Sequence, residues 1–459
     1  MVSNSGGIPT SDAFEQINWH AAGIDVGAEE IYVAVPEGCD GDRVRAFPTF
    51  TVELERIADW LKQCQITTVA MESTGVYWIP LFEILESGGF EVYLVNARHL
   101  KNVPGRKTDV LDCQWIQQLH TYGLLRASFR PSEEICALRA VVRQRDMLVR
   151  YRAAHIQHMQ KALHLMNIQL TQVLSDITGV TGMQIIRALV AGERDPQVLA
   201  SYRHGKCVHT ESDIVKALEG HYRREHLFAL RQALELYDLY GQQIAQCDAE
   251  LEAMYRDLEP PSAPPTSEVT QPPQPRTTKP RKNQASSDLA MSLYQMTGVD
   301  LTRIDGLDAL TAQVVLSETG LDMGKWPTVK HFTSWLGLCP QNEITGGKVK
   351  HRGTAKTHNR ANTALRVAAR ALWRSHSALG AFFRRIRSQH GGAIAVTATA
   401  HKLARMIYHL LKYRTDYRDP GTQAYDTQQR ERAERSLRRQ AARLGFTLTP
   451  ADPSPAAVS

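Results

Sequence analysis

The sequence lacks three features that would assign it to large classes of protein. It has no uninterrupted run of about 18 apolar residues, so we expect no membrane-spanning helix. Its seven cysteines are scattered without a Cys-x-x-Cys pair, which argues against a zinc site or disulfides and favours reduced thiols in the cytoplasm. The first residues have neither a basic start nor an apolar stretch, so we expect no secretory signal.

Positive charge is abundant in only one part of the chain. The whole sequence of 459 residues carries a net charge of +6, which by itself identifies no partner. Residues 346–420, however, hold 5 Lys and 11 Arg against two Asp, a net charge of +14. A basic helical region of this kind indicates nucleic-acid binding. The alternative interpretation is a solvated helix face.

The first half of the chain changes character near residue 129. Residues 19–128 contain short apolar runs such as AAGIDVG and ITTVAMES between helical stretches, which predicts an α/β sheet domain. Residues 129–257 carry apolar residues at helical spacing with few breakers. This pattern predicts two long helices, in a coiled-coil arrangement suited to self-association, with a shorter helical insert near 180–220.

A proline-rich stretch divides the second half. Eight prolines lie between Pro260 and Pro280, so we interpret residues 258–288 as an extended, disordered linker and a domain boundary. Residues 289–420 predict a mainly helical domain with a Gly- and Lys-rich loop at 338–360. Residues 1–18 form an N-terminal extension, and 421–459 a charged helix and tail. The expected fold class is therefore α/β followed by α.

Four acidic residues stand at positions from which they could converge. Asp25 and Glu72 each lie at the end of a candidate strand, and Asp109 and Asp112 share one face at the start of a candidate helix. Taken singly, such acids are usually strand-end caps or first-turn residues that complement a helix dipole. The combination favours a cluster, although four unrelated surface acids remain the alternative.

Such a cluster has a specific chemical use. Four neighbouring carboxylates repel one another unless cations lie among them. Mg²⁺ and similar hard ions prefer oxygen ligands and retain open positions for phosphate oxygens. Two such ions stabilise both the attacking and the leaving oxygen of a phosphodiester. The pattern therefore predicts phosphoryl transfer on nucleic acid.

The segments GIDVG, AMESTG and KTDVLD, which carry these acids, resemble the DEDD motifs of the IS-one-ten family of insertion-sequence transposases. The resemblance implies an RNase H-like N-terminal domain similar to the Holliday-junction resolvase RuvC. It implies that Asp25, Glu72, Asp109 and Asp112 form a metal-binding tetrad for Mg²⁺ or Mn²⁺. It also implies a bacterial protein that acts on the nucleoid.

The C-terminal region resembles the same family. LTRIDGLDALTAQVVLSETG is similar to its helix–hairpin–helix-like segment, in which N–H groups at a glycine turn, here Gly306, meet a phosphate. WLGLCPQNEITGGKVKHRGTAKTHNR resembles the segment that carries a serine nucleophile, and Thr345 occupies that position. The resemblance implies that Thr345 attacks DNA, although its methyl group restricts χ1 and crowds the attack.

Three alternatives to a Thr345 nucleophile stay open. Thr354 or Thr357 could supply the hydroxyl, the copy could be inactive, or Thr345 could simply cap the turn beside Gly-Gly. If a hydroxyl does attack, it needs metals on the N-terminal acids, so the site would combine two domains of one chain or of two protomers.

The predicted partners follow from the chemistry and from the resemblance. Five basic side chains are expected to hold backbone phosphates, namely Lys348, Lys350, Arg352, Arg360 and Arg366. Donor and target DNA must be brought together, which suggests a homodimer or tetramer. The family resemblance further implies a noncoding bridge RNA. The competing hypotheses are a RuvC-like nuclease that uses water and an inactive nucleic-acid-binding protein.

Overall fold

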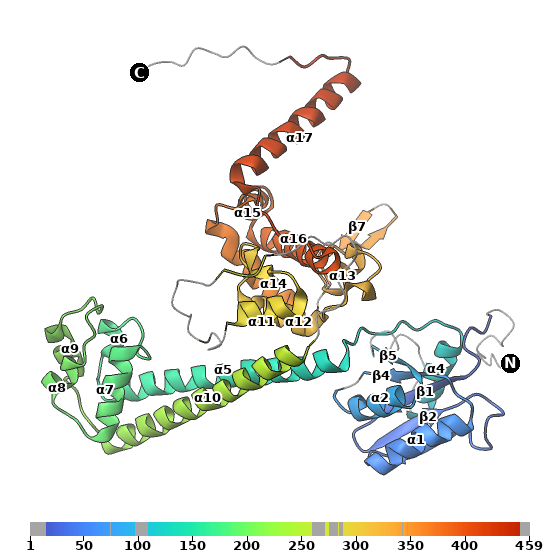
Figure 1. Ribbon diagram of the computed structural model, residues 1–459, viewed down its shortest axis with the longest axis horizontal. Helices are drawn as coiled ribbons and strands as arrows, with labels where there is room; N and C mark the ends of the chain where they lie inside the picture. Colours follow the sequence, from blue (N-terminus) through green and yellow to red (C-terminus); the bar gives the residue numbers. More distant parts are fainter. Residues whose placement is uncertain are drawn as a thin grey trace, which may run out of the picture. The chain divides into compact units, whose positions relative to one another are not determined.

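The computed structural model describes residues 15–73, 75–96, 109–258, 271–274, 283, 288–341, 343–346, 348–351, 353–355, 357 and 359–449 (Figure 1). The chain divides into two compact units, Met1–Arg130 and Pro131–Ser459. Within the described ranges, no helix combines the length and the apolar character needed to cross a membrane.

The first unit is built on a mixed five-stranded sheet with the order β3-β2-β1-β4-β5. Its strands are β1 (Ala21–Val26), β2 (Glu30–Ala34), β3 (Val44–Pro48), β4 (Thr68–Glu72) and β5 (Glu91–Val95). β1 pairs antiparallel with β2 and parallel with β4, and β5 pairs parallel with β4. β1 is therefore the central strand, and the parallel half places the carboxyl ends of β1 and β4 at the same edge.

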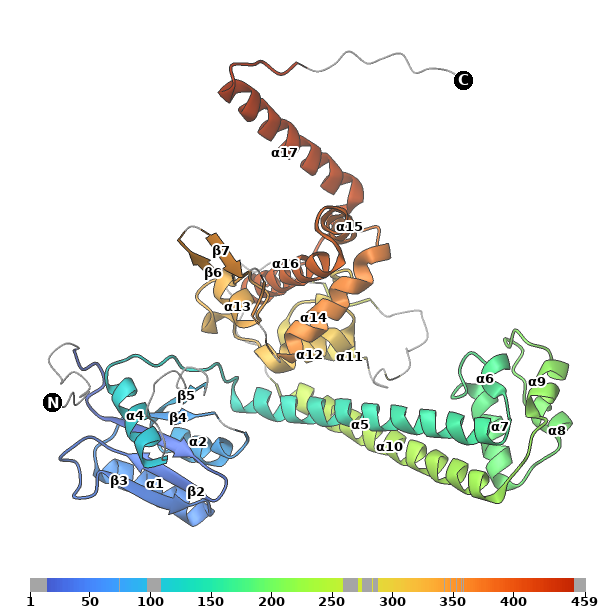
Figure 2. The same cartoon turned by 180° about the vertical axis from the view of Figure 1, so that it is seen from behind.

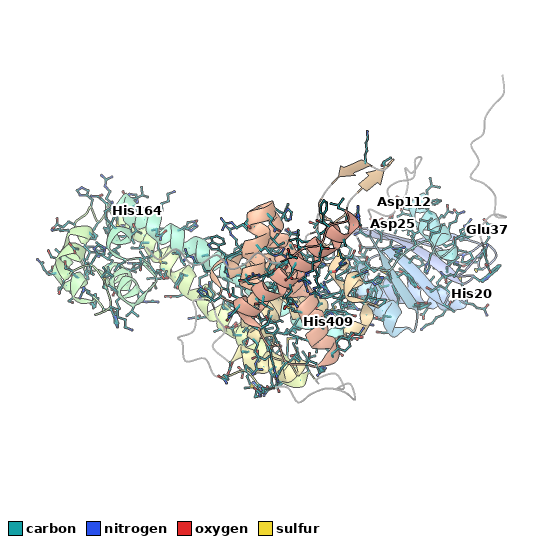
Figure 3. The ribbon with its side chains drawn as sticks, turned by 90° about the horizontal axis from the view of Figure 1, so that it is seen from above. His20, Asp25, Glu37, Asp112, His164 and His409 are labelled. Carbon is teal, nitrogen blue, oxygen red and sulfur yellow. The ribbon has the colours of Figure 1, made fainter. Side chains whose placement is uncertain are left out.

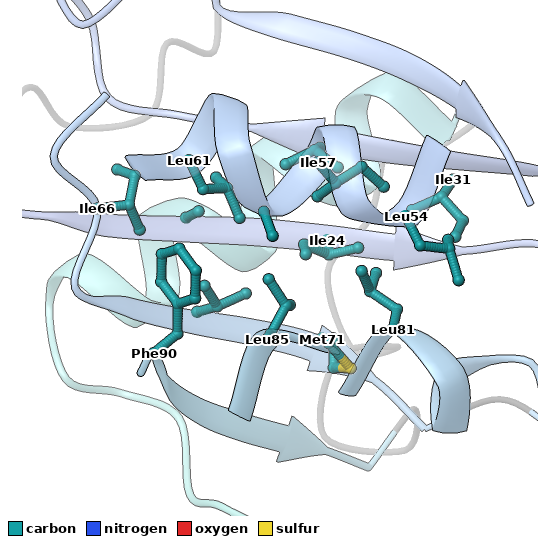
Figure 4. Packing of buried hydrophobic residues seen from close by; sticks show 14 of the residues in the cluster. Ile24, Ile31, Leu54, Ile57, Leu61, Ile66, Met71, Leu81, Leu85 and Phe90 are labelled. Atoms are coloured by element: carbon teal, nitrogen blue, oxygen red, sulfur yellow. The ribbon is translucent and has the colours of Figure 1, made fainter. Parts of the chain in front are cut away.

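The two faces of this sheet are covered by different helices. α1 (Thr51–Gln63) and α2 (Trp78–Ser87) bury leucine and isoleucine side chains against one face, together with Ile24 and Met71 (Figure 4). α4 (Asp109–Thr121) packs on β1 and β4 from the other face, where Ile116 contacts Ala70. The alternation of side chains along β1 and β4 supplies both apolar surfaces.

Two long helices begin the second unit. α5 (Glu133–Leu165) and α10 (Arg224–Asp257) lie side by side in both views (Figures 1 and 2). Their directions are opposite, because Arg145 pairs with Asp248 whereas His155 stacks on Tyr240. Between them the chain forms a small apolar bundle of α6 (Leu170–Val173), α7 (Val180–Ala191), α8 (Pro196–Ser201) and α9 (Glu211–Leu218).

The rest of the second unit is a helical bundle with one small hairpin. Its elements are α11 (Leu289–Thr297), η1 (Leu301–Arg303), α12 (Ala309–Thr319), η2 (Met323–Lys325), α13 (Val329–Trp335), β6 (Glu343–Thr345), β7 (Lys348–His351), α14 (Arg360–Ala371), η3 (Leu372–Arg374), α15 (Ala378–His390), α16 (Gly392–Tyr413) and α17 (Gly421–Arg443).

The bundle is attached to the long helices by polar contacts. Arg143 on α5 donates two hydrogen bonds to the buried Glu318 on α12, at 3.0 and 2.7 Å. Gln313 on α12 donates to the hydroxyl of Tyr255 on α10 at 2.6 Å. Parts of the chain on both sides of the predicted linker therefore pack together within one unit.

The predicted fold class, α/β followed by helices, is confirmed in this form. One difference lies in the predicted Gly- and Lys-rich loop, where the extended segments around Gly346 pair as β6 and β7. Most of the predicted linker, apart from residues 258, 271–274, 283 and 288, lies outside the described residues, as do 1–14 of the predicted extension. The predicted domain boundaries and the coiled-coil interpretation stay predictions.

Candidate active site

Asp25 lies on the sheet face that α4 covers. In β1, Ala22, Ile24 and Val26 point into the large apolar core beneath α1 and α2. Because successive side chains of a strand point to opposite faces, Gly23 and Asp25 face the other way. Asp25 is half-buried there, near the carboxyl end of the central strand.

Glu72 is brought to the same level on the neighbouring strand. The parallel ladder pairs Ile24 with Met71, so that Asp25 and Glu72 come next on their two strands. Glu72 has the same orientation as Ala70, which contacts Ile116 of α4. Since adjacent strands lie about 4.8 Å apart, the two acids are neighbours on one face.

The helix α4 approaches this face at Gly23. A Cβ atom on Gly23 would lie 2.2 Å from the Gln117 nitrogen and 2.4 Å from the Cys113 oxygen. Real side chains never come so close to main-chain atoms, so only glycine permits this packing. The distance between β1 and α4 is thus set by main-chain contact.

The direction of α4 places its first turn at the acidic edge. Near the end of the helix, His120 Nε2 lies 2.8 Å from the Thr68 hydroxyl, at the start of β4. In its middle, Cys113 and Gln117 meet Gly23. The helix therefore runs opposite to β1 and β4, and Asp112, near its start, lies towards the end that carries Asp25. Asp25 and Asp112 are both labelled in Figure 3.

The pKa of Cys113 reflects the negative charge at this edge of the sheet. The thiol is fully buried, and its pKa is raised to about 12, first by burial and further by the negative charges of Asp25 and Asp112. Both carboxylates therefore act on one buried sulfur, whose Sγ donates to the Val110 oxygen at 3.1 Å. A raised pKa favours the protonated form of the thiol at neutral pH.

Three of the four predicted acids are thus described, and the fourth only in part. Asp109 is the first residue of α4, but its side chain lies outside the described residues, as do the neighbouring positions 97–108. One Asp112 oxygen, Oδ1, is shielded from solvent. Among the described side chains, no three His, Cys, Asp or Glu come close enough to form a metal-binding group. The structure therefore brings Asp25, Glu72 and α4 to one edge without forming a closed ligand set.

Thr345 lies at the tip of the hairpin in the second unit. It is the last residue of β6 and pairs with Lys348 across the turn that begins at Gly346. Gly346 has a φ of 57°, a left-handed conformation that glycine adopts readily. Thr345 is exposed to solvent at the end of a β-hairpin.

The two alternative hydroxyls have different surroundings. Thr354 is half-buried, and its Oγ1 accepts a hydrogen bond from Arg366 at 3.3 Å. Thr357 is exposed, and its Oγ1 accepts from the Asn359 N–H at 3.1 Å, just before α14. The hydroxyls of Thr354 and Thr357 therefore help to order the segment between β7 and α14. Thr345, by contrast, is exposed in the hairpin.

The five predicted phosphate-binding residues also differ. Lys348 is exposed on β7, while the side chain of Lys350 and all of Arg352 lie outside the described residues. Arg360 forms an ion pair with Asp146 at 3.3 Å. Arg366 donates to Asn362 at 2.8 Å and to Thr397 at 2.7 Å, besides Thr354. The contacts of Arg366 indicate that it orders the protein around the loop.

Gly306, the predicted phosphate-binding turn, has a packing role. Its φ is 87°, and a Cβ there would lie 2.9 Å from the Ala368 oxygen and 3.0 Å from Leu372 Cγ. The glycine therefore lets the segment before α12 pack against α14. A phosphate contact of its N–H group stays a prediction.

Gly23 is the positioning residue that the sequence argument missed. It precedes Asp25 by two residues within GIDVG, and a glycine inside a strand often marks a close approach of another backbone. That signal was present in the sequence. Its partner, the main chain of α4, is about 90 residues away and could not be identified from spacing.

Comparison with known proteins identifies two matching regions. Residues 22–168 match a family described as "Transposase", under the label DEDD transposase of IS110, and residues 300–384 match the "Transposase IS116/IS110/IS902 family". The first range contains β1 from its second residue onward, β4 and α4, with all four acids. The second contains Gly306, the hairpin with Thr345, all of α14 and the start of α15.

A curated relative of this chain is also named as a transposase. The chain is 30% identical over 129 residues to a "Probable family 20 transposase" of Pseudomonas aeruginosa strain PAO1. The match covers 26% of this chain and 37% of the relative, so only about a third of the relative's length is spanned. By these two family matches, the chain belongs to the IS116/IS110/IS902 family of transposases.

Proposed function

We propose that this chain is the DNA recombinase of an insertion sequence, and that it cleaves and exchanges DNA strands in a divalent-metal-dependent reaction. The proposal rests on one observation. Asp25 and Glu72 lie side by side on adjacent strands, on the same face of the sheet and beside the first turn of α4. The order of the mixed sheet, with helices on both faces, supports an RNase H-like fold for this unit.

The residues at this edge suit a hard divalent ion. Asp25, Glu72 and Asp112 offer carboxylate oxygens, the ligand type that Mg²⁺ and Mn²⁺ prefer, and we assign Asp109 to the same set. When bound, such an ion supplies positive charge that neutralises phosphate oxygens and polarises an attacking oxygen. The protein's part is to hold the carboxylates at a fixed separation, and the Gly23 contact supports that role.

We further assign the attacking hydroxyl to Thr345. Its Oγ1 would form a bond to phosphorus while a phosphorus–oxygen bond to the deoxyribose breaks, and the proton lost from the hydroxyl is balanced by one gained by the leaving oxygen. The exposure of Thr345 at a hairpin tip supports access to DNA. The neighbouring Lys348 and, by sequence, Lys350 and Arg352 would hold backbone phosphates there.

Two partners complete the proposal. A homodimer or tetramer would hold two DNA sites, and the long pair α5 and α10 is the element best suited to join protomers. A bridge RNA encoded by the element would select donor and target. Both are inferred from the family and the chemistry of recombination.

The test is strand cleavage and joining on element-end DNA with Mg²⁺. Asp25→Asn should abolish both reactions while binding persists, because it removes a ligand charge and preserves the shape. Asp59→Asn, an exposed acid on α1, is the matched control and should retain activity. Normal recombination by Asp25→Asn would refute the role of the acids.

The nucleophile is tested on denaturing gels. Thr345→Ala should lose a covalent protein–DNA adduct, while Thr345→Ser should keep it or increase it because serine removes the crowding methyl group. An adduct that maps to Thr354 or Thr357 would show that this residue, and not Thr345, is the nucleophile. Cleavage without any adduct would instead favour a RuvC-like nuclease that uses water.

A further inference from the structure

A basic pocket lies in the second unit, away from the candidate acids and Thr345, although Thr354, the alternative hydroxyl, is among its lining residues. Its volume is 940 Å³, and its walls come from α15, α16 and α17, with Pro340, Gly353 and Thr354 at one side. The family matches end at residue 384, so all of α16 and all of α17 lie beyond them. Nothing in the proposed catalytic chemistry uses this pocket.

The charge of the lining is of one sign. Among the lining residues that the structure describes, none is Asp or Glu, and six carry basic or imidazole side chains: Arg385, His401, Lys402, Arg405, His409 and Arg432. Burial and then the charges of Arg385, Arg432 and Arg405 lower the pKa of Lys402. Cations held this close repel one another, and an anion in the pocket would relieve that repulsion.

Aromatic and apolar surface lies among these cations. Lys402 Nζ is 4.6 Å from the ring centroid of Phe382 and 5.5 Å from that of Tyr425. Arg385 Nε donates to the Tyr425 hydroxyl at 2.8 Å, which fixes the buried ring. Ile394, a lining residue, is 54% exposed. Cations beside flat and apolar surface suit a phosphate joined to a base better than a bare inorganic anion.

The size of the pocket limits what enters. A volume of 940 Å³ falls at the upper end of small-ligand pockets, large enough for an unstacked nucleotide. A base pair stacked within a duplex cannot enter a pocket of this size. The single strand is therefore the form of nucleic acid that fits.

The pocket is also connected to the loop of the candidate nucleophile. Arg366 donates hydrogen bonds to the hydroxyls of Thr397 and Thr354, and both threonines line the pocket. The hairpin of β6 and β7 lies between the lining residues Pro340 and Gly353 in the sequence. A strand held in the pocket would thus lie beside the segment that leads to Thr345.

We propose that this pocket binds an unstacked nucleotide of single-stranded nucleic acid, through its backbone phosphate and its base. Arg405 and Arg432, on α16 and α17, contact the phosphate, and Phe382 with Ile394 contacts the base. The inference goes beyond the recombination reaction and holds whether or not the acids cleave DNA.

The experiment measures binding by the full chain without divalent ions. Fluorescein-labelled 12-nucleotide oligothymidylate and oligouridylate are titrated in EDTA over a range of salt concentrations, with anisotropy as the readout. Arg405→Gln/Arg432→Gln should weaken binding by about tenfold. It should also lower the slope of log Kd against log salt by about 0.7, since the two arginines hold one phosphate and each phosphate contact on a single strand contributes about 0.7.

The matched control is Arg439→Gln/Arg443→Gln, which removes the same charge from exposed positions of α17 outside the lining. It should change the slope little, and this expectation holds even if the recombination proposal fails. The ratio of DNA to RNA affinity identifies which strand the pocket prefers.

Three results would overturn the inference. One is an equal loss in the control pair, which would indicate a general basic surface. Another is duplex DNA that binds as tightly as the single strand and with the same dependence on Arg405 and Arg432. The third is a polyglutamate peptide that competes as well as the oligonucleotide.

Discussion

The main chain of α4 approaches β1 at Gly23 more closely than any side chain would allow. Because the contact is between backbones, side-chain repacking cannot absorb an added methyl group. The residue has no part in the chemistry, yet it sets how far the start of α4 lies from Asp25 and Glu72. This is a positioning role that acts through main-chain distance.

Gly23→Ala is therefore expected to destabilise the first unit and to reduce cleavage. The cost of overpacking at such a contact is about 1–3 kcal/mol in the free energy of unfolding. Urea denaturation followed by circular dichroism measures it. Gly41→Ala is the control, because a Cβ at Gly41 meets no atom within 4 Å. Equal stability of the two variants would contradict the tight contact.

His120 gives the same unit a pH dependence. It is 1% exposed, and burial lowers its pKa to about 4, below the ordinary value of about 6.5. Between these values the unfolded chain binds a proton that the folded chain excludes. Stability is therefore full above pH 6.5 and is lost as the pH falls towards 4, by up to about 3 kcal/mol.

The measurement is the free energy of unfolding at several pH values between 4 and 7. His120→Gln keeps a polar group beside Thr68 but cannot titrate, so its stability should fall less steeply than that of the parent. Parallel curves for the two proteins would show that His120 is not the group responsible.

At the scale of elements, one buried ion pair joins the long helices. Arg145 Nε on α5 lies 2.5 Å from Asp248 Oδ1 on α10, and both side chains are less than a tenth exposed. The same guanidinium donates to the Asn283 oxygen at 2.9 Å. Removing either Arg145 or Asp248 alone would leave the other charge buried and unpaired. Replacing both with apolar side chains would leave no buried charge.

Asp248→Ala is expected to cost about 3–5 kcal/mol in the free energy of unfolding, because Arg145 stays charged and buried. The double variant Arg145→Met/Asp248→Leu should recover most of this loss, since apolar side chains of similar size fill the space. Thermal and urea unfolding of both variants decide the matter. If the double variant were as unstable as the single one, the charge argument would be wrong.

Local patterns predicted the elements that depend on neighbours in the sequence. The alternation in AAGIDVG and the helical spacing of residues 129–257 correspond to β1 and to α5 with α10. The pairing of β6 with β7 was missed, because its strands are too short to show a period. The basic pocket was also missed, because its walls come from residues separated by up to about 90 positions.

The sequence predicted which residues belong to the candidate site, but it did not predict how they are arranged in space. The motifs selected Asp25 and Glu72, and only the register of β1 and β4 showed that they are level. For Arg366 the sequence suggested a free phosphate ligand, whereas the structure shows three hydrogen bonds to protein groups. Charge counts do not reveal such partners, since these lie on other elements.

At the scale of the molecule, parts of the chain that precede and follow the proline-rich stretch contact each other. Glu318 and Gln313 on α12 bind Arg143 and Tyr255 on the long helices. A site-specific protease sequence inserted after Pro265 should therefore yield, after cutting, two pieces that still elute together from a sizing column. Separate elution would contradict the strength of these contacts.

Charge reversal tests which contact holds the pieces. Glu318→Arg faces Arg143 with a like charge and should release the pieces after cutting, because Glu318 is only 7% exposed. Glu250→Arg, at an exposed position of α10, is the matched control and should leave them associated. Release by both substitutions would assign the effect to net charge.

The attachment of α12 to α5 has a practical consequence. If noncovalent contacts suffice, the protein can be supplied as two polypeptides, one that ends and one that begins within the proline-rich stretch. The proposed recombination would then require both polypeptides to be present at the same time. The structure thus offers a way to make DNA rearrangement depend on two independent genetic inputs.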